Sequence, residues 1–257
     1  MRLGILSDIH SNLPALEAVL EAIGEAEIEQ TWCLGDVVGY GASPDECARA
    51  VASGCALSLV GNHDLAVVGK IDVASFSPAA AAAVRWTQRH STDETLRFLR
   101  GLEPADTSHQ VALYHASPRD PVWEYVLWPD QAAECIGDQA RRVSFVGHSH
   151  VALFFVMPCD DEAAEAPDRS PAGEVIARGA QAGDGTCLDL SEGRWLLNPG
   201  SVGQPRDGDP RAAWLELDTD EWTVTYHRVA YEIDRAAEAI AAADLPAHLA
   251  KRLYIGQ

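Results

Sequence analysis

Basic residues are scarce in this sequence of 257 residues. Its 19 lysines and arginines face 39 aspartates and glutamates, which gives a formal net charge of -20 at pH 7. So acidic a surface repels the phosphate backbone of DNA and RNA, and we therefore expect no extended nucleic acid as a partner. A small anion can still bind where buried cations reverse the field locally. A nuclease acting on single-stranded ends is disfavoured by the charge and stays open.

Paired cysteines and long apolar runs are also missing. The apolar run before Asp8 is too short for a signal peptide, and the run over residues 151–158 is too short to cross a bilayer. We expect reduced thiols, because no C-x-x-C pair or dense spacing occurs among the six cysteines, Cys33, Cys47, Cys55, Cys135, Cys159 and Cys187. These absences predict a soluble, cytoplasmic protein without a membrane partner.

The overall composition is that of an ordinary globular chain, with 47% hydrophobic and 23% charged residues. A chain of this length can share one continuous α/β core. We therefore predict a single domain over residues 1–257, with no internal repeat and no low-complexity linker. The sequence does not fix the oligomeric state, and a homo-oligomer stays open.

The first half of the chain repeats one local pattern, in which a short apolar run ends in polar residues. Such runs cover residues 2–7, 30–34, 56–60, 110–114 and 142–146, and helical spacing of apolar residues follows over 13–26 and 43–53. The runs predict strands. Because ligands of open α/β sheets bind outside the carboxyl ends of the strands, the polar residues there indicate a site.

The second half is expected to add short strands without intervening helices, over residues 153–156, 174–177, 186–190, 194–197, 212–217 and 222–229. These predict a second, largely antiparallel sheet. An acidic stretch over 160–169 is typical of a solvated hairpin loop. We expect helices over 77–101, partly covering the crevice, and closing helices over 234–243 and 246–253. The predicted fold is a four-layer α/β/β/α sandwich of two mixed sheets flanked by helices.

Seven side chains of metal-ligating type follow the predicted strands: Asp8, His10, Asp36, Asn62, His115, His148 and His150. Asp8 is equally typical of a helix cap, and Gly35-Asp36 of an ordinary turn. In the sequence Gly61-Asn-His-Asp64, an amide oxygen can bind a hard cation while His63 stays free for proton transfer. The other histidines, His90, His109, His227 and His248, are expected at the surface or in the core.

In this order, the D-x-H, G-D, G-N-H-D, lone His and G-H-S-H motifs resemble the calcineurin-like metallophosphoesterase superfamily. The resemblance covers residues 3–150, and Asn198-Pro-Gly-Ser-Val202 is similar to a further turn of that family. Gly35-Asp-Val-Val-Gly-Tyr-Gly41 is similar to small bacterial phosphodiesterases and diadenosine tetraphosphatase-like proteins. The phosphoprotein phosphatases of the superfamily instead carry G-D-x-x-D-R-G, which disfavours that activity here.

The resemblance implies one metal bound by Asp8, His10 and His150, and a second bound by Asn62, His115 and His148. It further implies that Asp36 bridges both ions and that His63 is the general acid. Mixed carboxylate, amide and imidazole ligands suit manganese, iron or zinc. Two such ions can share a hydroxide that attacks a small phosphodiester, or a nucleoside or dinucleoside polyphosphate. Asp64 either orients His63 or begins a helix.

Further side chains are candidates for substrate contact. Arg119 and Arg206 could hold a phosphate, although each is followed by an aspartate and could equally form a surface ion pair. The aromatic residues Trp123, Tyr125 and Trp128 could stack on a nucleobase or pack in a core. A catalytically silent scaffold with the same fold is the alternative. It would have no need of His63 together with a full set of metal ligands.

Overall fold

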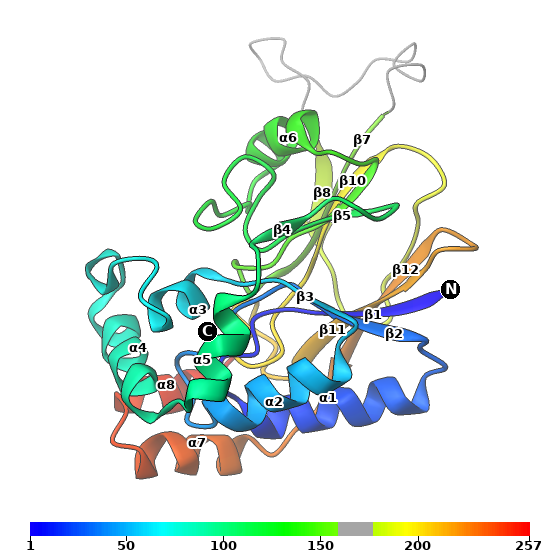
Figure 1. Cartoon of the computed structure of the whole chain (residues 1–257). Helices are drawn as coiled ribbons and strands as arrows, with labels where there is room; N and C mark the ends of the chain where they lie inside the picture. The colour runs from blue at the N-terminus through cyan, green and yellow to red at the C-terminus, as the bar shows by residue number, and fades with distance from the viewer. Residues whose placement is uncertain (159–176) are drawn as a thin grey trace.

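Two six-stranded sheets pack face to face in the computed structural model, which describes residues 1–158 and 177–257 (Figure 1). The strands are β1 (Arg2–Leu6), β2 (Gln30–Cys33), β3 (Leu57–Ser58), β4 (Ala105–Asp106), β5 (Ala112–Tyr114), β6 (Val143–Phe145), β7 (Ala152–Met157), β8 (Arg178–Gln181), β9 (Cys187–Asp189), β10 (Arg194–Pro199), β11 (Ala212–Asp218) and β12 (Thr223–Val229). The predicted loop over 160–169, and the predicted strand over 174–177 apart from Ala177, lie outside the described residues.

The helices are α1 (Leu13–Glu25), α2 (Pro44–Gly54), α3 (Asn62–Val67), α4 (Pro78–His90), α5 (Asp93–Arg100), α6 (Pro129–Asp138), α7 (Ile233–Ala242) and α8 (Ala247–Leu253), with a 3-10 turn over Val73–Ser75. Helix α1 begins where the Asn12 side chain accepts a hydrogen bond from the Ala15 amide, and it buries Leu16, Val19 and Ile23 along one face. Helix α6 was not predicted from the sequence. The side chains on its buried face are small apart from Ile136, so the helical spacing of apolar residues is weak in this part of the sequence.

The first sheet has the strand order β3-β2-β1-β11-β12-β9, and the second has the order β4-β5-β6-β10-β7-β8. Parallel pairs join β1 to β2 and β2 to β3, and likewise β5 to β6 and β6 to β10. The prediction that the later strands form a sheet of their own was wrong. Strand β11 pairs with β1, so β11, β12 and β9 complete the first sheet. Apolar alternation reveals a strand but not its partner.

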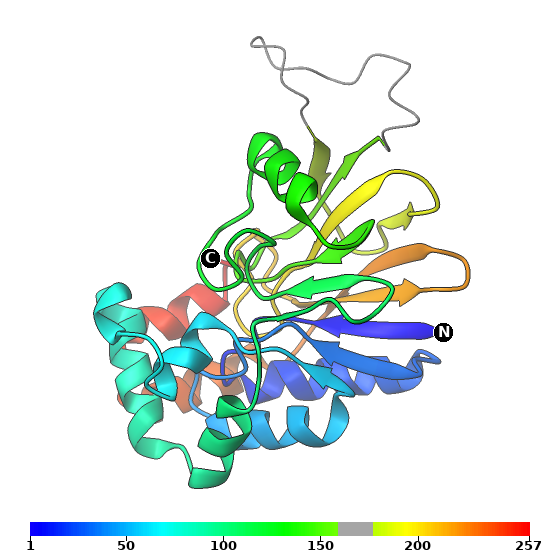
Figure 2. The same cartoon turned by 45° about the horizontal axis from the view of Figure 1, so that its top comes forward.

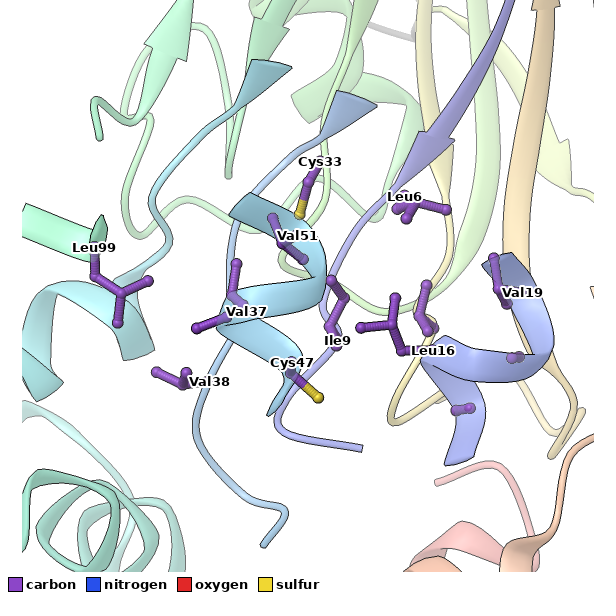
Figure 3. Packing of buried hydrophobic residues seen from close by; sticks show 14 of the residues in the cluster. Leu6, Ile9, Leu16, Val19, Cys33, Val37, Val38, Cys47, Val51 and Leu99 are labelled. Atoms are coloured by element: carbon purple, nitrogen blue, oxygen red, sulfur yellow. The ribbon is translucent and has the colours of Figure 1, made fainter. Parts of the chain in front are cut away.

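Four layers result, as predicted, with helices outside both sheets (Figure 2). Helices α1 and α2 cover the first sheet, and their apolar faces meet Leu6 and Cys33 (Figure 3). Leu3 and Ile5 point the other way, into the core between the sheets. Helix α6 covers the second sheet. Helices α7 and α8 pack on each other and, with α4, enclose Tyr40.

The described residues include five free cysteines. Over residues 1–158 and 177–257, no helix is both long enough and apolar enough to span a membrane.

The two sheets are also joined by a buried hydrogen bond, in which Tyr226 Oη of β12 donates to the Leu153 carbonyl of β7 at 2.8 Å. We expect Tyr226→Phe to lower the free energy of unfolding by about 1 kcal/mol, the usual net value of such a bond. Tyr254→Phe is the matched control, because the Tyr254 hydroxyl bonds Asp234 at the exposed surface. Urea denaturation measures both variants, and equal stability of Tyr226→Phe and the wild type would contradict a joining role.

Candidate metal centre

The seven predicted ligands lie together at the carboxyl ends of parallel strands from both sheets. Two groups of buried side chains have ligand atoms within 4.8 Å of one another, and both contain Asp36. Asp36 Oδ2 lies 3.5 Å from His10 Nε2 and 3.6 Å from His115 Nε2. Asn62 Oδ1 lies 3.3 Å from His115 Nε2. The complete groups are Asp8, His10, Asp36 and His150, and Asp36, His115 and His148.

Hydrogen bonds fix which nitrogen of three imidazoles faces the cluster. The Nδ1 atoms of His10, His115 and His150 lie 3.2, 2.9 and 2.7 Å from the backbone carbonyls of Val38, Leu34 and Gln204. A carbonyl only accepts, so each Nδ1 carries the proton and each Nε2 presents a lone pair. A backbone carbonyl holding the far nitrogen is a usual support for an imidazole that binds a metal.

These lone pairs are aimed at other acceptors. His10 Nε2 and His150 Nε2 are 3.0 Å apart, and His115 Nε2 faces the Asn62 oxygen. Two acceptors at this distance repel unless a cation lies between them. Two ligands held at about 2.1 Å from one ion stand about 3 Å apart when they subtend a right angle. The spacing therefore fits adjacent ligands of a shared metal ion.

Three further acceptors in the cluster are buried and have no hydrogen-bond partner within the described parts of the chain: Asp8 Oδ1, Asp36 Oδ2 and His148 Nε2. The second oxygen of each carboxylate is occupied, because the His148 amide donates to Asp8 Oδ2 and the His63 amide to Asp36 Oδ1. Buried polar atoms are normally satisfied. The unsatisfied atoms lie in the two groups of side chains just described, so the residues present fit metal ions.

The backbone at the cluster is strained. Asp8, His10, Asp36, His148 and His150 have φ values of 55, 51, 52, 62 and 61°. Residues other than glycine seldom adopt this left-handed region, and each such residue costs of order 1–3 kcal/mol. The rest of the fold must supply that free energy. Strain of this kind concentrates at functional sites, and it was not visible in the sequence.

Glycines next to the ligands permit close approach. An added Cβ at Gly61 would lie 2.0 Å from Asp36 Oδ1. One at Gly147 would lie 2.0 Å from Ser7 Oγ and 2.9 Å from Asp8 Oδ2. The glycines of the G-N-H-D and G-H-S-H motifs are thus required by the side chains of Asp36, Ser7 and Asp8 that pack against them.

Burial sets the charge state of the cluster. It lowers the pKa of His10, His115 and His150, and it lowers the pKa of His148 to about 3. Burial, followed by the charges of Asp64 and Asp8, raises the pKa of Asp36 well above its usual value. Desolvated carboxylates are normally paired or bound to metal. The cluster thus assembles neutral imidazoles and carboxylates that lack a positive partner.

His63 lies beside the two ligand groups and belongs to neither. Its ring packs against those of Tyr40, His10 and Phe76, with centroids 4.4, 4.8 and 4.9 Å away. Neither ring nitrogen makes a hydrogen bond within residues 1–158 and 177–257. A Cβ at Gly39 would lie 2.6 Å from its Nδ1 atom. Burial, followed by interactions with His150 and Arg206, lowers the pKa of His63 well below its usual value.

Asp64 is bound to backbone amides. Its carboxylate accepts from Gly61, Val37 and Val38 at 2.9 to 3.1 Å. This arrangement begins helix α3 and ties the Asp36 loop to the Asn62 turn. Of the two predicted roles, the helix-starting role agrees with these bonds, while no hydrogen bond joins Asp64 to the His63 ring among the described residues.

The two predicted phosphate-binding arginines are placed differently. Arg119 forms ion pairs with Glu124 and Glu134, as an ordinary surface pair does, which gives no support to a substrate role. Arg206 has no carboxylate within 4.0 Å among the described residues, and its Nε atom is buried without a partner. Its amide donates to the His150 carbonyl at 3.0 Å, which places it next to the ligand cluster.

Aromatic side chains surround the cluster. The ring of Tyr125, which is 44% exposed, lies 4.1 Å from that of His148. Trp123 packs on Phe76 at 5.3 Å, and Phe76 in turn contacts His63. Trp128 is 65% exposed. Sequence reasoning did not select Tyr40 or Phe76, because only the folded loops bring them to His63.

Known proteins match this chain over most of its length. Residues 1–220 match the model of the calcineurin-like phosphoesterase superfamily domain. The protein MJ0912 of Methanocaldococcus jannaschii is 37% identical over 262 residues, which cover 99% of this chain and 98% of that protein. A metallophosphoesterase from Sphaerobacter thermophilus has 38% identity, full coverage of both chains and a TM-score of 0.84. The chain therefore belongs to the calcineurin-like phosphoesterase superfamily.

Two more distant structures share the fold alone. The protein PH1004 of Pyrococcus horikoshii has a TM-score of 0.76 at 19% identity, covering 100% of this chain and 98% of that one. A protein described as a candidate diadenosine tetraphosphatase has a TM-score of 0.50 at 14% identity, covering 89% and 94%. Family and buried cluster together make this chain a phosphoesterase with a candidate site for divalent metal ions.

We expect Gly61→Ala to abolish most metal binding, because the new methyl group occupies the space of the Asp36 carboxylate. Gly54→Ala is the matched control, since a Cβ at Gly54 meets no atom within 4 Å. Metal content after reconstitution is measured by elemental analysis, with circular dichroism to confirm folding. A folded Gly61→Ala protein with full metal content would show that the close approach is unnecessary.

Proposed function

We propose that this phosphoesterase hydrolyses a small phosphodiester or a nucleoside or dinucleoside polyphosphate, using two metal ions. The proposal depends on two pairs of hydrogen-bond acceptors that face each other on either side of Asp36 Oδ2. One pair is His10 Nε2 with His150 Nε2, and the other is His115 Nε2 with Asn62 Oδ1. A single metal ion could bind between the two acceptors of one pair only. Two ions that share the Asp36 carboxylate would satisfy both.

Asp8, His10 and His150 would hold one ion, and Asn62, His115 and His148 the other. The donor set of carboxylate, amide and imidazole suits manganese, iron or zinc better than magnesium or calcium. When bound, such ions supply a nucleophile derived from water at neutral pH and positive charge for the phosphoryl oxygens. The backbone carbonyls of Val38, Leu34 and Gln204 would keep the imidazoles in the ligating orientation.

His63 would act on the leaving oxygen. Packing against Tyr40 and Phe76 fixes its ring, and no hydrogen bond to another described residue competes for its nitrogens. The negative charge of a bound phosphate favours the imidazolium, which offsets the effect of burial on its pKa. Arg206, free of carboxylate partners, would hold an anionic oxygen of the substrate.

The surface favours a small substrate. The net charge of -20 opposes an extended nucleic acid, and nothing in the proposal requires a membrane. A silent scaffold of the same fold is less consistent with the site, because it would keep five strained ligand positions without using them.

A screen of diesters, monoesters, nucleoside polyphosphates and dinucleoside tetraphosphates, each with added manganese, iron or zinc, tests the proposal. We expect turnover of a diester or polyphosphate, and Asp36→Asn should lose metal and activity together. The loss should be roughly 10²-fold or more, because indirect changes to metal ligands already cost 10–100-fold. If the metal-loaded wild type cleaves none of these compounds, the proposed function is wrong.

For His63→Ala we expect about 10²–10⁴-fold lower kcat with metal content unchanged, the usual range for loss of a general acid. The loss should shrink for substrates with an activated nitrophenyl leaving group, which needs no proton. His90→Ala is the control, since His90 lies on α4 and stacks on Trp86. Equal turnover of His63→Ala and the wild type would exclude the acid role, and loss of metal would make His63 a ligand instead.

A further inference from the structure

Two guanidinium groups lie beside Tyr40. The Arg206 guanidinium carbon is 5.9 Å from the centroid of the Tyr40 ring, and that of Arg252 is 6.0 Å from it. Arg206 Nη2 also lies 3.4 Å from Tyr40 Oη. Arg206 comes from the loop between β10 and β11, whereas Arg252 is on the last turn of α8. Two distant segments thus bring positive charge to one aromatic ring.

Neither arginine is paired with an aspartate or a glutamate. Within the described residues no Asp or Glu side-chain carboxylate lies within 4.0 Å of Arg206 or Arg252, although acids outnumber bases by 39 to 19. Asp207, the nearest acid in sequence, is bound to Arg228 instead. Arg252 Nε donates to the main-chain oxygen of Gln257, the last residue of the sequence. By contrast, several arginines of the chain do form ion pairs: Arg2, Arg119, Arg211, Arg228 and Arg235.

Such an arrangement is unfavourable without an anion. Both groups are partly buried, and the Nε atom of Arg206 is wholly enclosed with no partner among the described residues. Burial, followed by the charge of Arg206, lowers the pKa of Arg252, so the two cations act on each other. Like charges placed together in a region of low polarity are stabilised when an anion binds between them.

The pair lies next to the candidate metal centre. The Tyr40 ring is 4.7 Å from that of His10 and 4.4 Å from that of His63. Arg252 lies beyond residues 1–220, the part of the chain that matches the family model. The second guanidinium is therefore supplied by a segment outside the matched family domain.

We propose that Arg206, Arg252 and Tyr40 form a subsite for a second phosphate group of the substrate, separate from the phosphate that is cleaved. This inference rests on the proposed function and narrows it to nucleoside or dinucleoside polyphosphates. A diester with one phosphate has no second phosphate group for Arg252 to bind. Guanidinium groups bind phosphate oxygens in pairs, which gives both charge and direction.

The test compares Arg252→Gln with Lys251→Gln, which removes the same charge from the adjacent, exposed position of α8. Each is assayed on diadenosine tetraphosphate and on bis(p-nitrophenyl) phosphate. We expect Arg252→Gln to lower kcat/KM for the tetraphosphate about 10–100-fold, mainly through KM, as expected for one charged hydrogen bond. The diester should change by less than about twofold. Lys251→Gln should match the wild type on both substrates.

A binding experiment separates this inference from the proposed function. Inorganic tripolyphosphate is titrated calorimetrically into the metal-free protein, where no catalysis occurs. We expect binding by the wild type and Lys251→Gln, and about 10-fold or weaker binding by Arg252→Gln. Arg252→Lys should bind with intermediate affinity, and it replaces Arg252→Gln if that variant does not fold.

Three results would overturn the subsite. The first is equal loss of activity on both substrates, which would make Arg252 a support for Tyr40. The second is unchanged activity of Arg252→Gln on the tetraphosphate. The third is absence of tripolyphosphate binding by the wild type. Tripolyphosphate binding without any hydrolysis would instead retain the anion site and reject the proposed function.

Discussion

Repulsion between buried acceptors is the constraint on which the site depends. His10 and His150 present lone pairs to each other at 3.0 Å, and His115 presents one to the Asn62 oxygen. The backbone prevents relief by rotation, because each of the three rings is anchored through its other nitrogen to a carbonyl. A positive charge is the remaining way to stabilise this arrangement. The fit of this site to metal ions thus follows from hydrogen-bond direction as well as from residue type.

The loops that hold these acceptors are costly to fold. Left-handed backbone at Asp8, Asp36 and His148 is unfavourable, and glycines at 61 and 147 are needed so that neighbouring segments can touch. The apolar cluster under α1 and α2 supplies part of the opposing free energy, since Ile9 and Val37 from the same loops are wholly buried in it. The packing of the apolar core therefore helps to hold the ligand-bearing loops in place.

Much of this arrangement could be predicted from the sequence, because polar residues at strand ends are a local signal. Asp8 and Asp36 follow short apolar runs that end in polar residues, and the order of motifs resembles one family. Pairing of β11 with β1 could not be predicted, since alternation is the same for either sheet. The contact between Arg252 and Tyr40 could not be predicted from the sequence either. It depends on how α8 packs against segments distant in the sequence, and no short sequence motif indicates that packing.

The candidate ligands come from both sheets, with Asp8 and Asp36 following β1 and β2, and His115 and His148 following β5 and β6. An ion bound by ligands from both sheets would link the two sheets of the sandwich. Separation of the sheets would then require release of the ion, so resistance to heat would rise with the logarithm of free metal concentration. Metal supply would govern the lifetime of the folded chain as well as its chemistry.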